Sequence, residues 1–444
     1  MTVDLAGTRR DPPNAARSLR IGRLHLAKLR VDALAPVVRP SVPTRRGEIC
    51  MHTYDPYARA MQEDPFPTYR HFVEHEPCTY NAKMDFYALF RFEDVWQATL
   101  DWETYSSSLG PTLENRGQIP GELLSIIGID PPRHTRLRNL VSRGFTPRRI
   151  AAMEQEIRSL CQHYLDPLRG ERRFDVQQAF AVRLPMDVIS VLLGIPEADR
   201  DWYRDTVDGG LERDPETGQI SPENIQKLMQ SRAYVLELLA ERRKHPREDL
   251  ISILAQAEYE EPDGGTRRLG DDEVGAFTGL LAGAGAETTA KLIGNGVVYL
   301  SRHPDQRRWV LEDAAARLPD AIEELLRYDA PSQYQGRVAM RDVTVHGVTI
   351  PERARVALVT GAACRDPREF PDPDRLDVRR RPARSLYFGY GQHVCAGKSL
   401  ARLEARVALE EIARRWPEWQ VDEIGLTRTY QAHVRGFQNV PLVV

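Results

Sequence analysis

The pattern of apolar and polar residues along the chain predicts a protein that is mostly helical. Apolar residues recur every three or four positions through its middle, and this spacing is typical of amphipathic helices. Long helices are expected at about 132–144, 147–169, 176–194, 196–208, 222–244, 271–302, 304–316, 319–329 and 398–415. Shorter ones are expected at 64–75 and 93–100.

Strand-like patterns flank this helical middle. Two short runs around a polar turn within 78–92 precede it, and 343–350, 354–362 and the end of the chain follow it. Residues 101–128 carry Gly, Pro, Ser and Asn with little periodicity, which predicts a long loop. Helices in the middle with strands at the edges predict a mainly α protein of the α+β class.

Residues 1–50 differ from the rest because Arg is frequent and Pro recurs there. We expect a basic N-terminal extension that is loosely ordered. A basic amphipathic surface helix over 18–34 is the alternative. Residues 51–444 are expected to form a single domain, and Met51 is a candidate for a downstream start.

Composition favours a globular protein and excludes several classes of function. Apolar residues make up 41% of the 444 residues, which is enough for a large core. A formal net charge of −3 argues against a general nucleic-acid binder. The five cysteines form no C-x-x-C pair, which favours a reducing, cytoplasmic setting over a disulfide framework or a zinc site. No apolar run reaches membrane-spanning length, and no segment resembles a signal peptide, so no membrane contact is expected. The protein is also expected to be a monomer.

The most specific segment is the Gly-rich loop FGYGQHVCAG at 388–397. Its glycines permit tight turns and a positive φ. Cys395 directly precedes a strong helical pattern, and a helix N-terminus favours a thiolate over a thiol. A single thiolate without Cys or His partners at zinc spacing suits an axial ligand of haem iron. A zinc hydrolase that uses His393 and Cys395 is the non-haem alternative.

This loop resembles the haem-binding loop of the cytochrome P450 family, whose pattern is F-x-x-G-x-H-x-C-x-G. All five specified positions match in this sequence. The resemblance implies that Cys395 is the iron ligand, that Phe388 packs on the sulfur side of the haem and that His393 reaches a haem propionate. Gly389 and Gly397 are included among the expected haem-binding residues.

A run of small residues in the predicted helix 271–302 is followed by an acid and a hydroxyl. Glycines weaken a helix interior, so the run indicates that something flat lies close to the backbone. Tight helix–helix packing beside a solvated Glu is the alternative. The run is similar to the family motif A-G-x-[DE]-T at Ala284, Gly285, Glu287 and Thr288. The resemblance implies that Ala284 and Gly285 lie against the haem, and that Glu287 and Thr288 deliver protons to bound oxygen.

Basic residues elsewhere match the family's propionate-binding positions. His134 and Arg138 are four residues apart on one predicted helix, a spacing that suits a pair of carboxylates or a solvated basic face. They lie in a segment similar to the family's D-P-P-x-H-T-x-x-R, and Arg337 occupies the third propionate-binding position.

Glu324 and Arg327 match the family's E-x-x-R pair, whose role is structural. The family locks this pair onto an Arg of the segment before the Cys loop. Arg379 or Arg380 is the candidate for that third residue.

The resemblance covers about residues 55–444 and implies a cytochrome P450 fold that encloses haem b. The implied activity is a monooxygenase that uses O2 to hydroxylate or epoxidise a hydrophobic small molecule. Electrons would come from a separate ferredoxin or flavodoxin with its reductase. We expect this partner to dock on a basic proximal face made of Arg133, Arg136, Arg143, Lys398, Arg402 and Arg406.

Substrate contacts are expected from 103–128, 209–222, 279–288, 332–336 and 430–434. Polar groups at Gln333, Tyr334 and Gln335 favour a substrate with oxygen functions, such as a polyketide, terpenoid or steroid. Two alternatives stay open: a family member that catalyses desaturation or oxidative coupling, and a haem-binding sensor without turnover.

Overall fold

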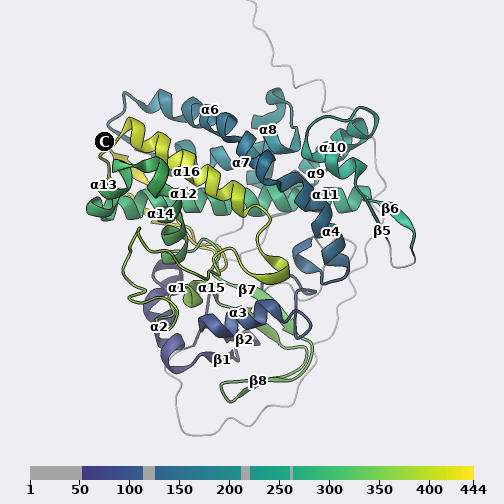
Figure 1. Cartoon of the computed structure of the whole chain (residues 1–444), viewed down its shortest axis with the longest axis vertical. Helices are drawn as coiled ribbons and strands as arrows, with labels where there is room; N and C mark the ends of the chain where they lie inside the picture. Colours follow the sequence, from purple (N-terminus) through teal and green to yellow (C-terminus); the bar gives the residue numbers. More distant parts are fainter. Residues whose placement is uncertain (1–52, 114–125, 212–220, 261–263) are drawn as a thin grey trace, which may run out of the picture. The chain divides into compact units, whose positions relative to one another are not determined.

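Helices fill the middle of the chain in the structure, as the sequence pattern predicts (Figure 1). This computed structural model describes residues 53–444 apart from 114–125, 212–220 and 261–263. The predicted extension at 1–50 and the candidate start at Met51 lie outside the described residues. The expected class is confirmed, since the fold is mainly α with several small sheets.

The strands before and after the helical region combine in one five-stranded sheet. Its order is β1 (Cys78–Asn81), β2 (Phe86–Leu89), β10 (Arg355–Leu358), β7 (Gln335–Ala339) and β3 (Tyr105–Ser106). β2 and β10 run parallel, and the other neighbours are antiparallel. Pairing of β10 with β7 sets Val356 opposite Arg337. This register fixes the position of Arg337 in the middle of β7. The short helices beside the sheet are α1 (Arg59–Glu63), α2 (Phe66–His75), α3 (Phe92–Leu100) and α15 (Thr360–Ala363).

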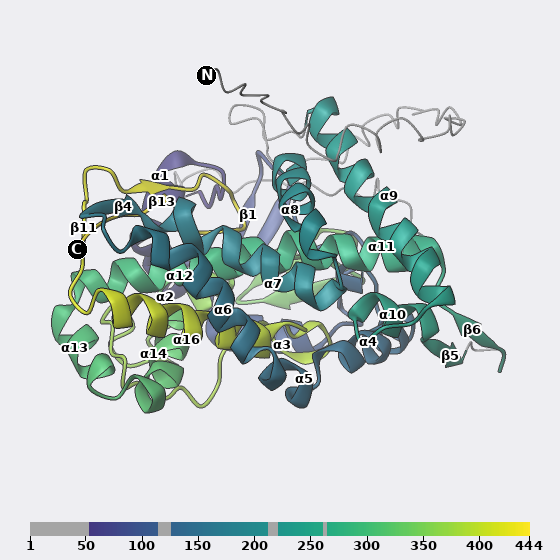
Figure 2. The same ribbon diagram turned by 90° about the horizontal axis from the view of Figure 1, so that it is seen from above.

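The helical region runs from α4 to α14 (Figures 1 and 2). Its helices are α4 (Arg133–Ser142), α5 (Pro147–Ala152), α6 (Glu154–Leu165), α7 (Arg183–Leu193), α8 (Glu197–Leu211), α9 (Pro222–Lys244), α10 (Leu250–Gln256), α11 (Asp271–Leu280), α12 (Ala286–Arg302), α13 (Pro304–Glu312) and α14 (Ala314–Tyr328). Two π-helical segments, η4 (Gln177–Ala181) and η5 (Leu281–Gly285), precede α7 and α12. Short 3-10 turns lie at η1 (Ile126–Gly128), η2 (Arg143–Phe145) and η3 (Asp166–Leu168).

The C-terminal third adds the helix that follows the cysteine loop. After the hairpin β8 (Val343–Val345) and β9 (Val348–Ile350), the chain reaches η6 (Gly391–His393) and then α16 (Lys398–Arg415). Four short strands end the chain: β11 (Gln420–Val421), β12 (Thr427–Arg428), β13 (Phe437–Asn439) and β14 (Pro441–Val443). β14 pairs with β11 and with β4 (Arg173–Asp175), and β12 pairs with β13.

Three predicted boundaries are wrong for local reasons. The helix expected at 147–169 is divided at Met153 into α5 and α6. The helix expected at 319–329 begins earlier, so Pro319 lies inside α14. Its start is set by Asp313, because the Asp313 carboxylate accepts a hydrogen bond from the Ala316 N–H at 3.2 Å. No helix or strand was expected between 244 and 271, yet the structure has α10 and the hairpin β5 (Glu258–Glu260) and β6 (Thr266–Arg268) there, elements too short to show a clear period.

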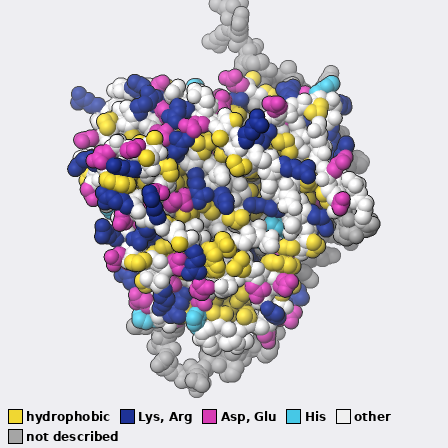
Figure 3. Space-filling model, viewed as in Figure 1, with side chains coloured by type: hydrophobic (Ala, Val, Ile, Leu, Met, Phe, Trp, Pro, Cys, Tyr) yellow, Lys and Arg dark blue, Asp and Glu magenta, His cyan; other side chains and the backbone are white. Residues whose placement is uncertain are grey.

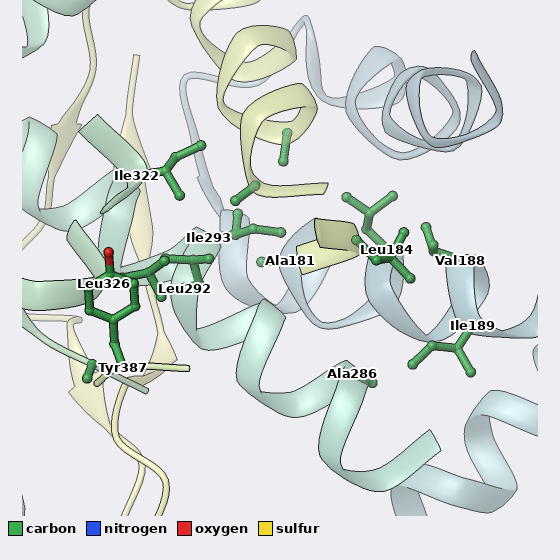
Figure 4. Close-up of a cluster of buried hydrophobic side chains, with 14 of the residues drawn as sticks. Ala181, Leu184, Val188, Ile189, Ala286, Leu292, Ile293, Ile322, Leu326 and Tyr387 are labelled. Atoms are coloured by element: carbon green, nitrogen blue, oxygen red, sulfur yellow. The ribbon is translucent and has the colours of Figure 1, made fainter. Parts of the chain in front are cut away.

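The core is formed where α7, α12, α14 and α16 pack together. Figure 4 shows α7 facing α12 through Leu184, Ile189 and Ala286, while Ile322 and Leu326 approach from α14. α12 is buried along most of its length from Thr289 to Leu300, which makes it the central helix of the described fold. Within the described residues, no helix combines the length and the apolar character needed to cross a membrane.

A buried ion pair ties α14 to the segment before the cysteine loop. Glu324 and Arg327 are fully buried and joined by two hydrogen bonds of 2.7 and 2.8 Å. Arg327 also donates to the carbonyls of Cys364 and Pro373, at 3.1 and 2.8 Å. Arg380 completes the group at 3.2 Å from the Glu324 carboxylate. Of the two candidates for the third residue, the structure selects Arg380.

Candidate functional site

The cysteine loop is held open by two residues in the left-handed region. Gly389 and Gly391 have φ values of 68° and 67°. A side chain at Gly391 would place its Cβ 2.7 Å from the carbonyl oxygen of Thr99. Both the positive φ and this close approach therefore require glycine at 391. The Cys395 N–H donates to the Phe388 carbonyl at 2.8 Å, which closes the loop just before α16. Cys395 is exposed, whereas the other described cysteines are buried.

The environment of the Cys395 thiol combines opposing influences. Cys395 has exposed surface as a residue, but desolvation by the atoms packed around its sulfur raises the pKa of the thiol. The backbone N–H of Gly397 and the charges of Arg138, Arg402 and Lys398 act in the other direction and favour the thiolate. The sulfur is therefore accessible to a ligand and faces donors that stabilise negative charge.

Two histidines with unsatisfied ring nitrogens meet beside this loop. The rings of His134, at the start of α4, and His393 lie 4.2 Å apart. Both ring nitrogens of His134 and Nε2 of His393 are buried without a hydrogen-bond partner among the described residues. Burial lowers the pKa of His134 to about 4. Burial and the nearby charges of Arg337, His134 and Arg138 lower the pKa of His393 to about 2.

Arg138 and Arg337 add two guanidinium groups to the same cluster. Arg138 donates to the carbonyl of Val394, next to the cysteine, and its charge acts on both His393 and Cys395. Arg337 is buried, and the one hydrogen bond the structure gives its side chain runs to its own neighbour, the Gly336 carbonyl at 2.7 Å. Burial lowers the pKa of Arg337 to about 10, and Asp130 partly offsets the shift.

Asp130 is a site residue to which the sequence reasoning gave no role. Its carboxylate accepts a hydrogen bond from the Ser107 N–H at 2.9 Å and another from the Ser106 hydroxyl. It thereby fixes the end of β3 next to Arg337 and supplies an opposing charge. The sequence could have indicated this role, because Asp130 is the first residue of the segment that contains His134 and Arg138.

These residues fit a group that carries carboxylates. Buried donors normally find acceptors, yet His134, His393, Arg138 and Arg337 converge on one region with few acceptors supplied by the described chain. Paired guanidinium and imidazole donors are suited to carboxylates. A porphyrin with two propionates beside an accessible sulfur ligand satisfies both requirements.

The run of small residues lies where the long helix changes its geometry. Residues Leu281–Gly285 form the π-helical segment η5 between α11 and α12. The Thr288 hydroxyl donates to the Ala284 carbonyl at 2.8 Å, and Glu287 accepts a hydrogen bond from Gln431 at 2.9 Å. A Cβ at Gly285 would lie 3.0 Å from Ile189, so helix packing alone explains this glycine, whereas Ala284 is exposed.

The expected substrate segments are described only in part. Residues 114–125 and 212–220 lie outside the described residues. Gln333 is buried and uses its amide inside the protein, since it accepts from Tyr69 at 2.7 Å and donates to the Ala330 carbonyl at 2.6 Å. Gln335 likewise donates to Ser332 at 2.7 Å. These two amides therefore give little support to a polar substrate.

Comparison with known proteins shows which family has this fold and this arrangement of residues. The model of the cytochrome P450 family matches residues 219–424. Putative cytochrome P450 123 of Mycobacterium tuberculosis is 39% identical over 393 residues, which cover 88% of this chain and 96% of that protein.

Two solved bacterial structures share the fold. The bacillaene polyketide synthase cytochrome P450 PksS of Bacillus subtilis superposes with a TM-score of 0.78 at 29% identity, covering 88% of this chain and 99% of that one. CYP109E1 of Bacillus megaterium in complex with corticosterone gives a TM-score of 0.77 at 28% identity, covering 87% and 99%.

Fold and similarity together define an oxidoreductase of the monooxygenase class. The chain belongs to the cytochrome P450 family, which binds haem b. Because the chain belongs to this family, the zinc hydrolase that would use His393 and Cys395 is excluded. Within the described ranges, no three His, Cys, Asp or Glu side chains gather to hold a metal ion.

Proposed function

We propose that this enzyme inserts oxygen into a hydrophobic small molecule at a haem held by Cys395. The observation that carries the proposal is the convergence of His134, His393, Arg138 and Arg337 beside an exposed cysteine at a helix N-terminus. In this assignment Cys395 would ligate the haem iron, and the four basic residues would hold the propionates. Phe388, Gly389, Gly397, Ala284 and Gly285 line the haem.

The bound haem supplies the oxygen chemistry: O2, two electrons and two protons give one oxygen atom in the product and one water. The protein provides position and protons. Thr288 lies on the Ala284–Thr289 turn with its hydroxyl already tied to the Ala284 carbonyl, so it can exchange that bond for one to a ligand. Glu287 accepts from Gln431 and is the adjacent acid. We assign proton delivery to this pair.

A polyketide, terpenoid or steroid is the proposed substrate class. Support comes from relatives, since the B. megaterium structure contains corticosterone and the B. subtilis structure is a polyketide synthase P450. The internally bonded amides of Gln333 and Gln335 favour a mainly apolar substrate surface in that region.

The test is a carbon monoxide difference spectrum of the reduced holoenzyme, followed by a substrate panel scored by the low-spin to high-spin change. We expect a thiolate-type spectrum and turnover that adds one oxygen atom to the product mass. A loss of two hydrogens would identify a desaturase or coupling enzyme. Failure to consume reduced cofactor with any panel member that shifts the spin state would favour a sensor and overturn the proposal.

We further propose that a cytoplasmic ferredoxin or flavodoxin delivers electrons on the face formed by α4 and α16. The structure makes this face less basic than the sequence suggests. Arg402 pairs with Glu323 at 2.5 Å, Arg406 with Glu154 at 2.6 Å and Arg133 with Glu273 at 3.5 Å. Lys and Arg are interspersed with Asp and Glu on the face seen in Figure 3.

Arg143 and Lys398 are exposed and have no ion pair among those the structure describes, so the docking face is best tested at these two residues. Charge reversal at both, to Glu, should slow reduction by ferredoxin at low salt, with the difference shrinking as salt rises. Stopped-flow reduction measures this. Lys83→Glu, on the exposed turn between β1 and β2 and outside the proposed docking face, is the control. Equal rates at all salt concentrations would refute the docking face.

A further inference from the structure

The outer side of α3 presents large apolar side chains to solvent. Leu100 is 43% exposed, and Trp96, one helical turn earlier, is half-buried. Val95 and Ala98, on the opposite side of the helix, are buried in the core. α3 therefore has apolar surface where an amphipathic helix normally has polar residues.

The cysteine loop adds an aromatic ring to this surface. Tyr390 is 41% exposed, and its ring lies on that of Trp96, with the ring centres 3.7 Å apart and an angle of 23° between the planes. A Cβ at Gly391 would lie 3.5 Å from Leu100 Cδ2, so the loop also contacts the end of α3. We call Trp96, Leu100 and Tyr390 the α3 patch. Hydrophobic side chains gather over α3 and the cysteine loop on the face seen in Figure 3, which has the view of Figure 1.

Charged groups border the α3 patch. The guanidinium of Arg384 lies 5.3 Å from the centre of the Trp96 ring and pairs with Glu93 of α3 at 2.8 Å. Lys398, three residues after Cys395, is exposed at the start of α16. Contiguous apolar surface inside a polar rim marks sites of interaction between proteins, and aromatic side chains are enriched at the centre of such sites.

We propose that the α3 patch is the apolar centre of the surface on which a ferredoxin docks. The inference rests on the proposed function, which requires an external electron donor. The position of the patch favours this occupant, because Tyr390 belongs to the loop that leads to Cys395, the residue proposed to ligate the haem iron. Electrons pass efficiently between proteins only when the two redox centres are close. Complexes of redox proteins are small, burying less than about 1,200 Å² in total, and a few large side chains with a charged rim suit that size.

Apolar contact is needed on this face because its charge is partly compensated. Arg402 and Arg406 of α16 are paired with Glu323 and Glu154. The exposed cations of the face steer a partner toward it, whereas desolvated aromatic side chains hold the partner in place. The α3 patch and the basic residues of α4 and α16 therefore have separate roles in one docking surface.

The first experiment measures the binding of oxidised ferredoxin to the oxidised holoenzyme by calorimetry. The probe is the two-iron ferredoxin that reduces wild type fastest in a panel. In the double variant Trp96→Gln, Tyr390→Thr, the Kd should rise about tenfold, because aromatic side chains at an interface centre commonly contribute that much. The heat-capacity change of binding should become less negative, since less apolar surface is buried. This loss should persist at high salt, unlike that of the Arg143 and Lys398 reversal.

The second experiment measures electron transfer by stopped flow. In this step the iron–sulfur cluster of ferredoxin loses one electron and the ferric haem gains it. The second-order rate constant should fall about tenfold in the double variant. Reduction by dithionite and the carbon monoxide spectrum should stay as in wild type, because neither requires a docked protein. Tyr390→Phe, which keeps the ring, should bind ferredoxin and be reduced like wild type.

Tyr80→Thr is the matched control for the loss of an exposed, stacked tyrosine. Tyr80 is 44% exposed, and its ring centre lies 4.7 Å from that of Tyr87 on the β1–β2 hairpin, outside the proposed docking surface. Its Kd and rate constant should equal those of wild type. Thermal unfolding confirms that each variant is folded.

Wild-type binding and reduction in the folded double variant would overturn the inference and leave the proposed function standing. Failure of every ferredoxin to reduce wild type, although dithionite does so, would overturn both the inference and the proposed partner. Sedimentation that shows a dimer for wild type and a monomer for the double variant would assign the α3 patch to a second copy of this chain, and would also overturn the inference.

Discussion

Cys395→Ser should abolish the thiolate spectrum of the reduced carbon monoxide complex and reduce monooxygenase activity to background. Cys395 is the exposed cysteine of the described set, and the Gly397 N–H and three cationic side chains act on its sulfur. Thiolate donation favours O–O cleavage in haem enzymes, and a serine oxygen cannot supply the same donation. The difference spectrum and product formation, measured on the same preparation, check both effects.

Cys78→Ser provides the matched control for this variant. Cys78 is buried in β1, and burial raises the pKa of its thiol to about 12, so it is an inert structural cysteine. Its spectrum should match wild type even if some stability is lost. A thiolate spectrum that survives in Cys395→Ser would remove the basis of the site assignment, because a sulfur other than that of Cys395 would then be the iron ligand.

Arg327→Ala should destabilise the protein by about 3–5 kcal/mol, because it leaves the fully buried Glu324 carboxylate without its main partner. The same change removes the hydrogen bonds that hold the Cys364 and Pro373 carbonyls. The chain between Pro373 and the cysteine loop should loosen, so haem retention should fall together with stability. Urea unfolding and the haem-to-protein absorbance ratio measure the two losses.

Arg381→Ala is the comparison for this ion pair. Arg381 pairs with Asp320 at 2.7 Å on the surface, and 79% of its side chain is exposed. Exposed pairs contribute about 0–1 kcal/mol, so this variant should be nearly neutral. Equal effects of the two substitutions would mean that the buried network does not hold the segment before the loop.

Short-range pattern was sufficient for the helical fold and for the order of the motifs. The period of α9 and α16 and the FGYGQHVCAG loop are local properties of the chain. The two histidines were each expected at a propionate, but their ring contact at 4.2 Å joins residues separated by more than half the chain. Such a contact depends on tertiary packing, which no local pattern contains.

The positions of charged and polar residues in the sequence did not show which partners their side chains find in the structure. The basic residues of α16 were expected to face a partner, yet Arg402 and Arg406 are neutralised by Glu323 and Glu154 from other helices. Gln333 was expected in a substrate-contacting segment, and in the structure its amide oxygen accepts a hydrogen bond from Tyr69. A sequence shows that a side chain is polar, but its partner is chosen by residues far away in the chain.

The π-helical segment η5 means that α11 and α12 do not share one helical phase, although they run on as a single helix. One additional residue in a turn rotates everything after it by about 100°, because an α-helix has 3.6 residues per turn. Removing a single residue from 281–285 would therefore turn Glu287, Thr288 and Lys291 together toward a different neighbour. A deletion in this region is therefore expected to move the Glu287 carboxyl, the Thr288 hydroxyl and the Lys291 ammonium together.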